Sequence, residues 1–406
     1  MGRGVTLIPV KFSQLVKRVG GDGADAWDTH YRALAAKERG ENVIILSVGD
    51  PDVATPAPVV ERAVDALQAG DTHYTAIRGR GTLRERIARL HESRCGQRLA
   101  PEQVIVLCGA QNALLVSMLC LTQAGDEALT FDPMYSTYPA SLEASGATLV
   151  RVPLDRDNGF RLDLERLRSA ITPRSRILSF ATPGNPTGSI LSASELAAIG
   201  ELACAHDLWI VADEVYAGLA PEGRVPSLAQ QLPERVVTIG SLSKSHAMCG
   251  WRVGWMTGPR ELIDHAENLV LCMLYGLPGF IQEAAITALD MADDAERRMR
   301  SYCERRAALM LEHLQGIPGI RPLPPQAGMF MLIDVRDSGL DGAAFAQGFF
   351  DRHGVSTIAG SAFGTQTRDC VRLSFAVEEP LIVEACTRLR RYCADLRAEA
   401  RAPSRR

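Results

Sequence analysis

The chain has 406 residues, of which 46% are hydrophobic and 23% charged, and its formal net charge is −4. This length exceeds what one hydrophobic core usually holds, so two domains are expected. The charge balance argues against nucleic-acid binding, and no apolar run approaches bilayer-spanning length. Ten cysteines without a C-x-x-C pair argue against a disulfide framework or a metal site and favour a reducing, cytoplasmic compartment.

The first two thirds of the chain carry an alternating pattern of strands and helices. A helix is expected near the N-terminus, over residues 27–40. Short β-branched runs then predict strands at residues 104–108, 128–131, 176–180, 209–212 and 236–239, with helical patterns between them. This alternation predicts an α/β fold with a mostly parallel sheet covered by helices on both faces.

After residue 300 the pattern changes to that of a smaller α+β domain. A long charged helix over 296–314 precedes expected strands at 328–334 and 371–375 and a final amphipathic helix. We therefore predict an N-terminal arm and helix that pack with the small domain (1–48), a large domain (49–295), a small domain (296–395) and a disordered tail (396–406).

Lys244 has unusual neighbours for a lysine. It ends the segment Ser241-Leu-Ser-Lys244 and is followed by small and apolar residues, with Arg252 eight positions later and no adjoining carboxylate. Such surroundings suit a desolvated amine that acts as a nucleophile. The alternative is a solvated loop lysine, which is the commoner case, so the partners of Lys244 must decide.

Several polar residues share one predicted location, just beyond the C-terminal ends of the strands. In open α/β sheets, ligands bind at that edge. Each residue alone has an ordinary interpretation, such as a helix N-cap for Asp213, a turn for Asn185 or a core position for a tyrosine. Together they favour a binding site made of Gln111, Tyr135, Asn185, Asp213, Tyr216, Ser241, Ser243 and Lys244.

One part of this site is suited to a phosphate. The small-residue turn before Ala110 and Gln111 opens a helix, whose free N–H groups favour an anion. Ser241 and Ser243 add hydroxyl donors, and Arg252 adds a planar guanidinium that can donate two charge-assisted hydrogen bonds to a phosphate. A lysine beside a phosphate-bearing ligand suggests a Schiff base with pyridoxal 5′-phosphate.

The remaining residues suit the ring of the same cofactor. A carboxylate at a buried strand end, Asp213, can keep the pyridine nitrogen protonated and make the ring an electron sink. Asn185 and Tyr216 can hydrogen-bond the 3-hydroxyl oxygen, and Tyr135 can stack on the ring. No metal is needed for this chemistry.

Three separate segments carry a resemblance to a known family. Pro183-Gly-Asn-Pro-Thr-Gly188, Asp213-Glu-Val-Tyr216 and the stretch from Ser241 to Gly254 resemble the aspartate aminotransferase superfamily, in order and in spacing. These are class I/II enzymes of fold type I that use pyridoxal phosphate. The resemblance implies that Lys244, Asp213 and Tyr216 are catalytic, with Lys244 as Schiff-base lysine and general acid/base. The sequence departs from the family's usual pattern at Cys249, where threonine is common.

The resemblance also implies roles that the residues alone do not reveal. Gly49 and Asn185 lie against the substrate, and Arg372 binds its α-carboxylate; without the resemblance, Arg372 is interpreted as a solvated strand residue. Tyr74 matches a tyrosine that reaches the phosphate of the neighbouring subunit, which implies a homodimer with active sites at the interface. The alternative is a loop tyrosine within its own subunit.

Segments 23–34, 72–74 and 271–282 are similar to bacterial transaminases that move the amino group of L-arginine to pyruvate by a ping-pong mechanism. A guanidinium substrate favours a carboxylate partner, and Asp28 is the hypothesis for that role. The alternative is that Asp28 only caps a helix. Other possible functions are an aminotransferase of aspartate, aromatic or broad specificity, a C–S lyase on the same scaffold, or a ligand-sensing domain of a transcription regulator.

Overall fold

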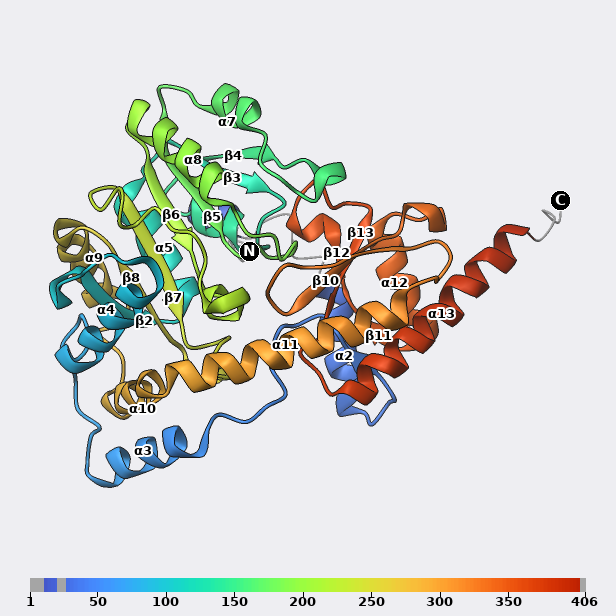
Figure 1. Ribbon diagram of the computed structural model, residues 1–406, viewed down its shortest axis with the longest axis horizontal. Helices are drawn as coiled ribbons and strands as arrows, with labels where there is room; N and C mark the ends of the chain where they lie inside the picture. The colour runs from blue at the N-terminus through green and yellow to red at the C-terminus, as the bar shows by residue number, and fades with distance from the viewer. Residues whose placement is uncertain (1–10, 20–26, 402–406) are drawn as a thin grey trace, which may run out of the picture.

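The computed structural model describes residues 11–19 and 27–401 of the chain. It has two lobes, each built around a β-sheet, and the long helix α11 (Ala292–Leu314) runs along both (Figure 1). Within the described residues the larger sheet has seven strands in the order β2 (Val104–Cys108), β8 (Val253–Thr257), β7 (Val236–Ser241), β6 (Trp209–Asp213), β5 (Ser175–Ala181), β3 (Glu127–Asp132) and β4 (Thr148–Pro153).

The larger sheet is parallel except for β8, which runs antiparallel to both of its neighbours. The predicted α/β fold with a mostly parallel sheet is therefore confirmed. Five of these strands were expected from the sequence, whereas β4 and β8 were not. β8 begins at Val253, inside the segment from Ser241 to Gly254 that carries the family resemblance.

Helices cover both faces of the larger sheet because successive side chains of a strand point to opposite faces. In β2, Ile105 and Leu107 belong to one buried cluster, and Val104 and Val106 belong to another. One face is covered by α5 (Ala110–Leu121), α6 (Tyr138–Glu143) and α9 (Arg260–Met273), and the other by α4 (Gly81–Cys95), α7 (Leu164–Ala170), α8 (Ala193–Ala205) and α10 (Gly279–Asp290).

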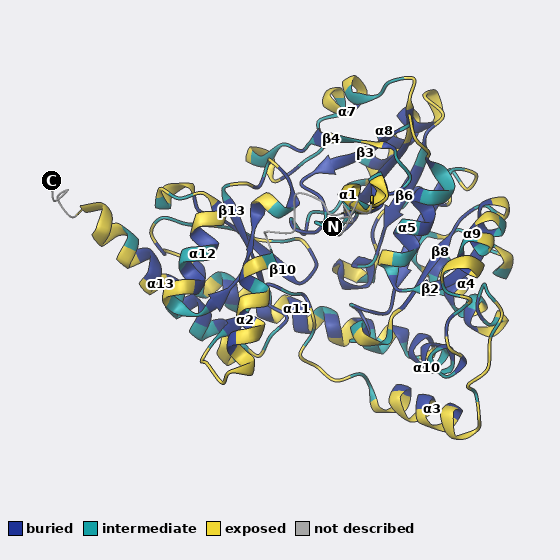
Figure 2. Cartoon of the chain, turned by 180° about the vertical axis from the view of Figure 1, so that it is seen from behind, coloured by how far each residue is buried: buried dark blue, intermediate teal, exposed yellow. Residues whose placement is uncertain are grey.

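The strands of both lobes are buried, whereas the outer faces of the helices are exposed, as on α3 (Ala57–Gln68) (Figure 2). The short helix α1 (Gln14–Arg18) lies against the larger lobe. Its Arg18 donates from Nε to the carbonyl of Glu143, at the end of α6, at 3.1 Å. Among the described residues, no helix combines the length and the apolar character that crossing a membrane requires.

The smaller lobe has an antiparallel sheet with the order β12 (Ile358–Ala359), β13 (Cys370–Ser374), β10 (Phe330–Asp334) and β9 (Arg321–Leu323). Its core is shared with α11, α12 (Gly342–His353) and α13 (Glu379–Arg401). The helix α13 continues to Arg401, so the prediction of a disordered tail is wrong for residues 396–401; residues 402–406 lie outside the described part.

The N-terminal helix packs with the smaller lobe. The helix α2 (Asp28–Glu38) is tied to it by Thr29 Oγ1, which donates to the carbonyl of Thr357 at 2.9 Å. The next strand, β1 (Ile44–Ile45), pairs in parallel with β11 (Val355–Ser356). The chain thus enters the larger lobe only after residue 45, close to the predicted boundary.

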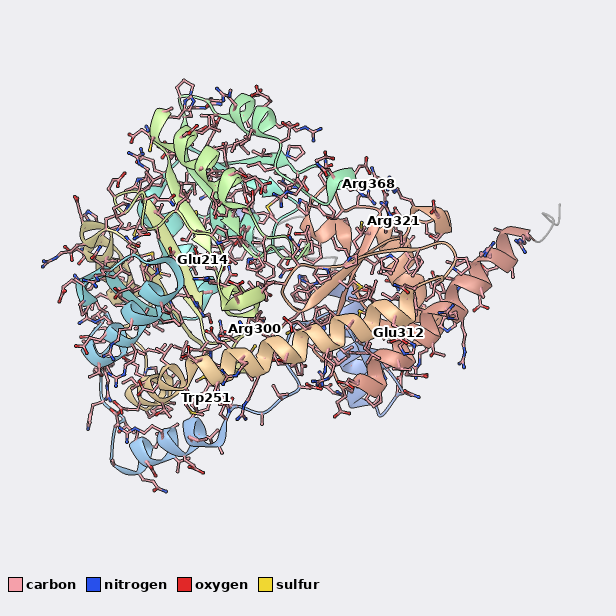
Figure 3. The ribbon with its side chains drawn as sticks, in the orientation of Figure 1. Glu214, Trp251, Arg300, Glu312, Arg321 and Arg368 are labelled. Carbon is pink, nitrogen blue, oxygen red and sulfur yellow. The ribbon has the colours of Figure 1, made fainter. Side chains whose placement is uncertain are left out.

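The two lobes are connected along α11, which begins at Ala292, four residues earlier than predicted. Arg300 on this helix donates from Nη1 to the carbonyls of Gly218 and Ala220, at 3.2 and 3.4 Å (Figure 3). These carbonyls lie in the turn η4 (Ala217–Leu219) and at the residue after it, so α11 supports the segment that follows Tyr216 beyond the end of β6.

Candidate active site

A cavity of about 190 Å³ lies where five strands of the larger sheet end and the smaller lobe meets them. β2, β3, β5, β6 and β7 each deliver residues to it from their C-terminal ends, as expected for this edge of an open sheet. Of the residues predicted from sequence, those lining it are Gly49, Ala110, Gln111, Tyr135, Asn185, Asp213, Tyr216, Ser241, Ser243, Lys244, Arg252 and Arg372.

The reversed direction of β8 explains how Arg252 reaches this cavity. An antiparallel strand begins where its parallel neighbours end, and Gly254 and Val253 are paired with Ser241 of β7 and Cys108 of β2. Arg252 precedes β8 in the left-handed backbone region, with φ of 57°. Its side chain is thereby brought beside the serines and the start of α5.

This corner of the cavity is rich in hydrogen-bond donors. The Arg252 guanidinium is held by the carbonyls of Cys249 and Cys108, at 2.8 Å from Nη1 and 3.4 Å from Nη2, and it pairs with no carboxylate among the described residues. The hydroxyl oxygens of Ser241 and Ser243 lie 2.8 Å apart. Because α5 begins without a side-chain cap, its first N–H groups are free for an anion.

The approach of Arg252 to α5 requires glycine at position 109. Gly109 has φ of 79°, and a Cβ atom there would lie 2.3 Å from Nη2 of Arg252. A side chain would therefore be strained and would displace the guanidinium. Backbone and arginine together form a cradle for a small anionic group.

Asp213 places a buried carboxylate in the same cavity. Its side chain accepts hydrogen bonds from Tyr138 Oη at 2.8 Å and from the backbone N–H of Val215 at 3.2 Å. Burial raises the pKa of Asp213, and the hydrogen bond from Tyr138 opposes that rise. Such a carboxylate is stabilised in its charged form when a ligand brings a protonated nitrogen to it.

Lys244 is half-buried between the two lobes. Its Nζ donates to the carbonyl of Gly49 at 2.7 Å and lies 3.8 Å from Sγ of Cys249. Among the described residues, no carboxylate forms an ion pair with this amine. The position of Gly49 requires glycine, since a Cβ atom there would lie 2.4 Å from the Phe330 ring. Lys244 is also the only lysine of the chain beyond residue 37, a signal that was missed in the sequence.

Arg372, on β13, is enclosed although it carries a charge. It is 2% exposed, donates to Oδ1 of Asn185 at 2.9 Å and to the carbonyl of Ser47 at 2.7 Å, and lies between the rings of Phe330 and Phe363. Burial lowers its pKa to about 10, so it remains charged at neutral pH. The interpretation of Arg372 as a solvated strand residue is wrong.

No carboxylate neutralises Arg372 among the residues that the structure describes, and its Nε has no hydrogen-bond partner there. An arginine buried without a counter-ion is costly unless a ligand supplies the anion. The geometry therefore favours a small carboxylate between Arg372 and Lys244.

Two predicted residues lie elsewhere. Asp28 is the first residue of α2, its side chain is 58% exposed and 3.7 Å from Arg32, and Trp27 occupies the N-cap position. Asp28 is therefore not the N-cap, and it does not line the cavity. Its role as the partner of a substrate guanidinium stays a prediction. Tyr74 is 85% exposed and packs on Tyr275, with ring centroids 4.7 Å apart.

Other residues of the cavity were not predicted to take part. Tyr138, Cys249 and Phe330 line it. Tyr138 begins α6 three positions after Tyr135, and its backbone N–H donates to the carbonyl of Tyr135 at 2.9 Å, which closes a turn between the two residues. That spacing could have indicated Tyr138, whereas nothing local to Phe330 marks it.

The two-lobed fold and this cavity agree with one family of known proteins. The family described as aminotransferase class I and II matches residues 41–389. The chain belongs to this family and is an aminotransferase.

Individual relatives cover nearly the whole chain. It is 48% identical over 393 residues to an arginine–pyruvate transaminase of Pseudomonas aeruginosa, with 96% of this chain and 100% of the relative aligned. It is 32% identical to an aspartate aminotransferase of Geobacillus stearothermophilus, with 89% and 94% aligned. Among solved structures, the aspartate aminotransferase of Thermus thermophilus with maleate matches with a TM-score of 0.89 and 30% identity, covering 95% of this chain and 100% of that one.

Proposed function

We propose that this aminotransferase uses pyridoxal 5′-phosphate to move the amino group of L-arginine to pyruvate. Arg372 is buried with no carboxylate partner among the described residues, and it lines the same cavity as Lys244. This observation carries the reaction type, because a buried guanidinium favours a substrate carboxylate beside the reactive amine. The identity of 48% to a transaminase named for arginine and pyruvate supports the choice of substrates.

The chemistry of the donor set fits this cofactor. Arg252, the two serines and the free N–H groups of α5 would hold the phosphate, and Asp213 would pair with the pyridine nitrogen. Asn185 and Tyr216 would hydrogen-bond the ring hydroxyl. When bound, pyridoxal phosphate supplies an electron sink for the negative charge that develops at the substrate's α-carbon.

The protein's own residues then orient and deprotonate the amino acid. Arg372 and Asn185 hold the α-carboxylate, which points the α-carbon toward Lys244. The Nζ of Lys244 removes the α-proton and later returns a proton, so one amine acts as both base and acid. The keto acid product leaves before pyruvate enters the same site, which predicts ping-pong kinetics.

A homodimer is part of this proposal. Tyr74 and Tyr275 form an exposed aromatic pair, with Leu271 and Met273 also exposed nearby on α9. Exposed apolar patches of this kind mark interaction surfaces. Covering by a second copy would bring Tyr74 close to the partner's phosphate site. A cytoplasmic location is supported by the ten cysteines, all of which are free.

A substrate screen tests the proposed function. Protein loaded with pyridoxal phosphate is mixed with single amino acids, and loss of the visible band of the lysine-bound cofactor is followed. L-Arginine should react fastest, and arginine with pyruvate should give alanine with parallel-line kinetics. Reaction with aspartate but not with arginine would overturn the substrate assignment and leave the class intact. Ammonia or thiol release without a keto acid acceptor would instead indicate a lyase.

Substitution of Gly109 by alanine tests the phosphate cradle. The new Cβ must displace Arg252, so cofactor affinity should fall roughly tenfold, as for loss of a charge-assisted hydrogen bond. Fluorescence titration of the apoprotein with pyridoxal phosphate measures this. Gly250→Ala is the matched control, because nothing lies within 4 Å of its would-be Cβ. Equal affinities of the two variants would contradict the role of Arg252.

A further inference from the structure

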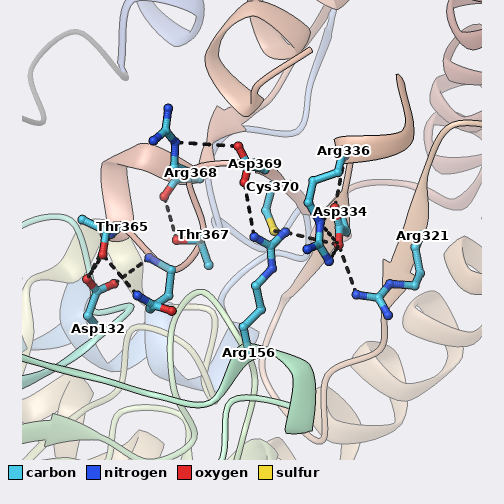
Figure 4. Close-up of polar contacts among 12 residues, drawn as sticks. Asp132, Arg156, Arg321, Asp334, Arg336, Thr365, Thr367, Arg368, Asp369 and Cys370 are labelled. Atoms are coloured by element: carbon cyan, nitrogen blue, oxygen red, sulfur yellow. Dashed lines mark hydrogen bonds and ion pairs between the residues drawn. The ribbon is translucent and has the colours of Figure 1, made fainter. Parts of the chain in front are cut away.

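Asp132 is a buried carboxylate that the proposed reaction does not use. It ends β3, is 1% exposed, and faces a loop of the smaller lobe that follows η8 (Gly360–Phe363). Its Oδ2 accepts hydrogen bonds from the N–H and the hydroxyl of Thr365, at 3.0 and 2.7 Å, and its Oδ1 accepts one from the N–H of Gln366 at 3.2 Å. Figure 4 shows Asp132 beside Thr365, next to a separate ion cluster around Asp334.

The loop is shaped for this carboxylate. Gly364 has φ of 139°, and a Cβ atom there would lie 2.0 Å from Oδ1 of Asp132. A second connection lies close by, since the N–H of Met134 donates to the carbonyl of Phe363 at 2.8 Å. Four hydrogen bonds thus connect Asp132 and Met134, at the end of β3 in the larger lobe, to residues 363–366 of the smaller lobe.

This loop carries one wall of the Arg372 site. The Phe363 ring is 1% exposed and lies 4.7 Å from the Arg372 guanidinium, on which the Phe330 ring also packs at 3.9 Å. Arg372 has no charged partner among the described residues, so its orientation depends on these rings and on two acceptors, Asn185 and Ser47. Moving Phe363 would leave one side of the guanidinium without support.

We propose that Asp132 is a positioning residue for substrate carboxylate binding. It fastens residues 363–366 to the end of β3, which holds Phe363 against Arg372 and keeps the guanidinium aligned with the substrate. It precedes Tyr135 by three residues, so one strand end orders both the cofactor side and the carboxylate side of the cavity. The inference rests on the proposed function, in which Arg372 binds the α-carboxylate.

Asp132→Asn in the holoenzyme tests this role, since its amide group opposes the Thr365 donors while the side-chain size is kept. The KM for L-arginine and for pyruvate should each rise roughly tenfold, with kcat changed less than about threefold. A second substrate is the amine that lacks only the α-carboxylate of L-arginine. Asp132→Asn and the wild type should react equally with this amine. Thr365→Val, which removes only the hydroxyl donor, should raise both KM values by a smaller factor of about three.

Arg336→Gln is the matched control, because Arg336 binds Asp334 in the neighbouring ion cluster and leaves the loop intact. A rise in KM for this variant equal to that of Asp132→Asn would overturn the proposal, as would an equal loss with the amine. Hydrogen exchange gives a readout that does not depend on turnover. Exchange at residues 363–366 should be at least about tenfold faster in Asp132→Asn. Unchanged protection would refute the inference even if the proposed function holds, whereas a wild type that reacts with no amino acid would refute the function alone.

Discussion

Lys244→Ala is expected to reduce transamination about 10⁴-fold, because the variant lacks the group that moves the α-proton. Its visible absorbance should also lack the band of the lysine-bound cofactor, since the other lysines lie at or before residue 37. Steady-state kinetics with L-arginine and pyruvate measure the first effect, and the spectrum of the loaded protein measures the second.

Lys37→Ala is the control for this substitution. Lys37 is an exposed residue of α2 and does not line the cavity. Its variant should keep both the activity and the absorbance band of the wild type. A Lys244→Ala protein that retained the band would refute the assignment of the Schiff-base lysine.

The second large effect is expected for Asp213→Asn, which should lower kcat/KM by about 10³-fold. The amide keeps the size of the side chain but cannot neutralise a protonated ring nitrogen, so the cofactor becomes a poor electron sink. Single-turnover rates with L-arginine measure this directly. A rate close to that of the wild type would contradict the pairing of Asp213 with the cofactor.

Tyr138→Phe is expected to have a smaller effect on the same carboxylate. It removes the 2.8 Å hydrogen bond to Asp213, which lowers the pKa of that carboxyl in the wild type. Without the donor the pKa of Asp213 rises, so the carboxylate is protonated at higher pH. The acid limb of the kcat/KM profile should therefore move to higher pH, and the rate at its plateau should fall by no more than about tenfold. A limb that moved to lower pH would contradict this sign.

The cavity could be predicted largely from the sequence because its residues follow strands. Parallel strands end at one edge, so residues just beyond β3, β5, β6 and β7 must meet there whatever the details of packing. The two-domain α/β fold could be predicted for the same reason, since it depends on the alternation of short apolar runs and helical patterns.

Residues whose roles depend on packing could not be predicted in this way. Tyr138 and Asp213 are 75 positions apart, and their hydrogen bond depends on how α6 sits on the sheet. The enclosure of Arg372 by Phe330 and Phe363 depends on two strands and a loop of the smaller lobe. The outward direction of Asp28 is set by the rotation of α2, which the weakly amphipathic sequence of that helix does not determine.

Reduction of the loaded enzyme with borohydride tests the central claim most directly. Reduction makes the bond between lysine and cofactor permanent and blocks trypsin at the modified lysine. The account predicts one labelled tryptic peptide, residues 236–252, which runs uncut from the residue after Arg235 through Lys244 to Arg252. A label on Lys11, Lys17 or Lys37, or no retained label, would contradict it.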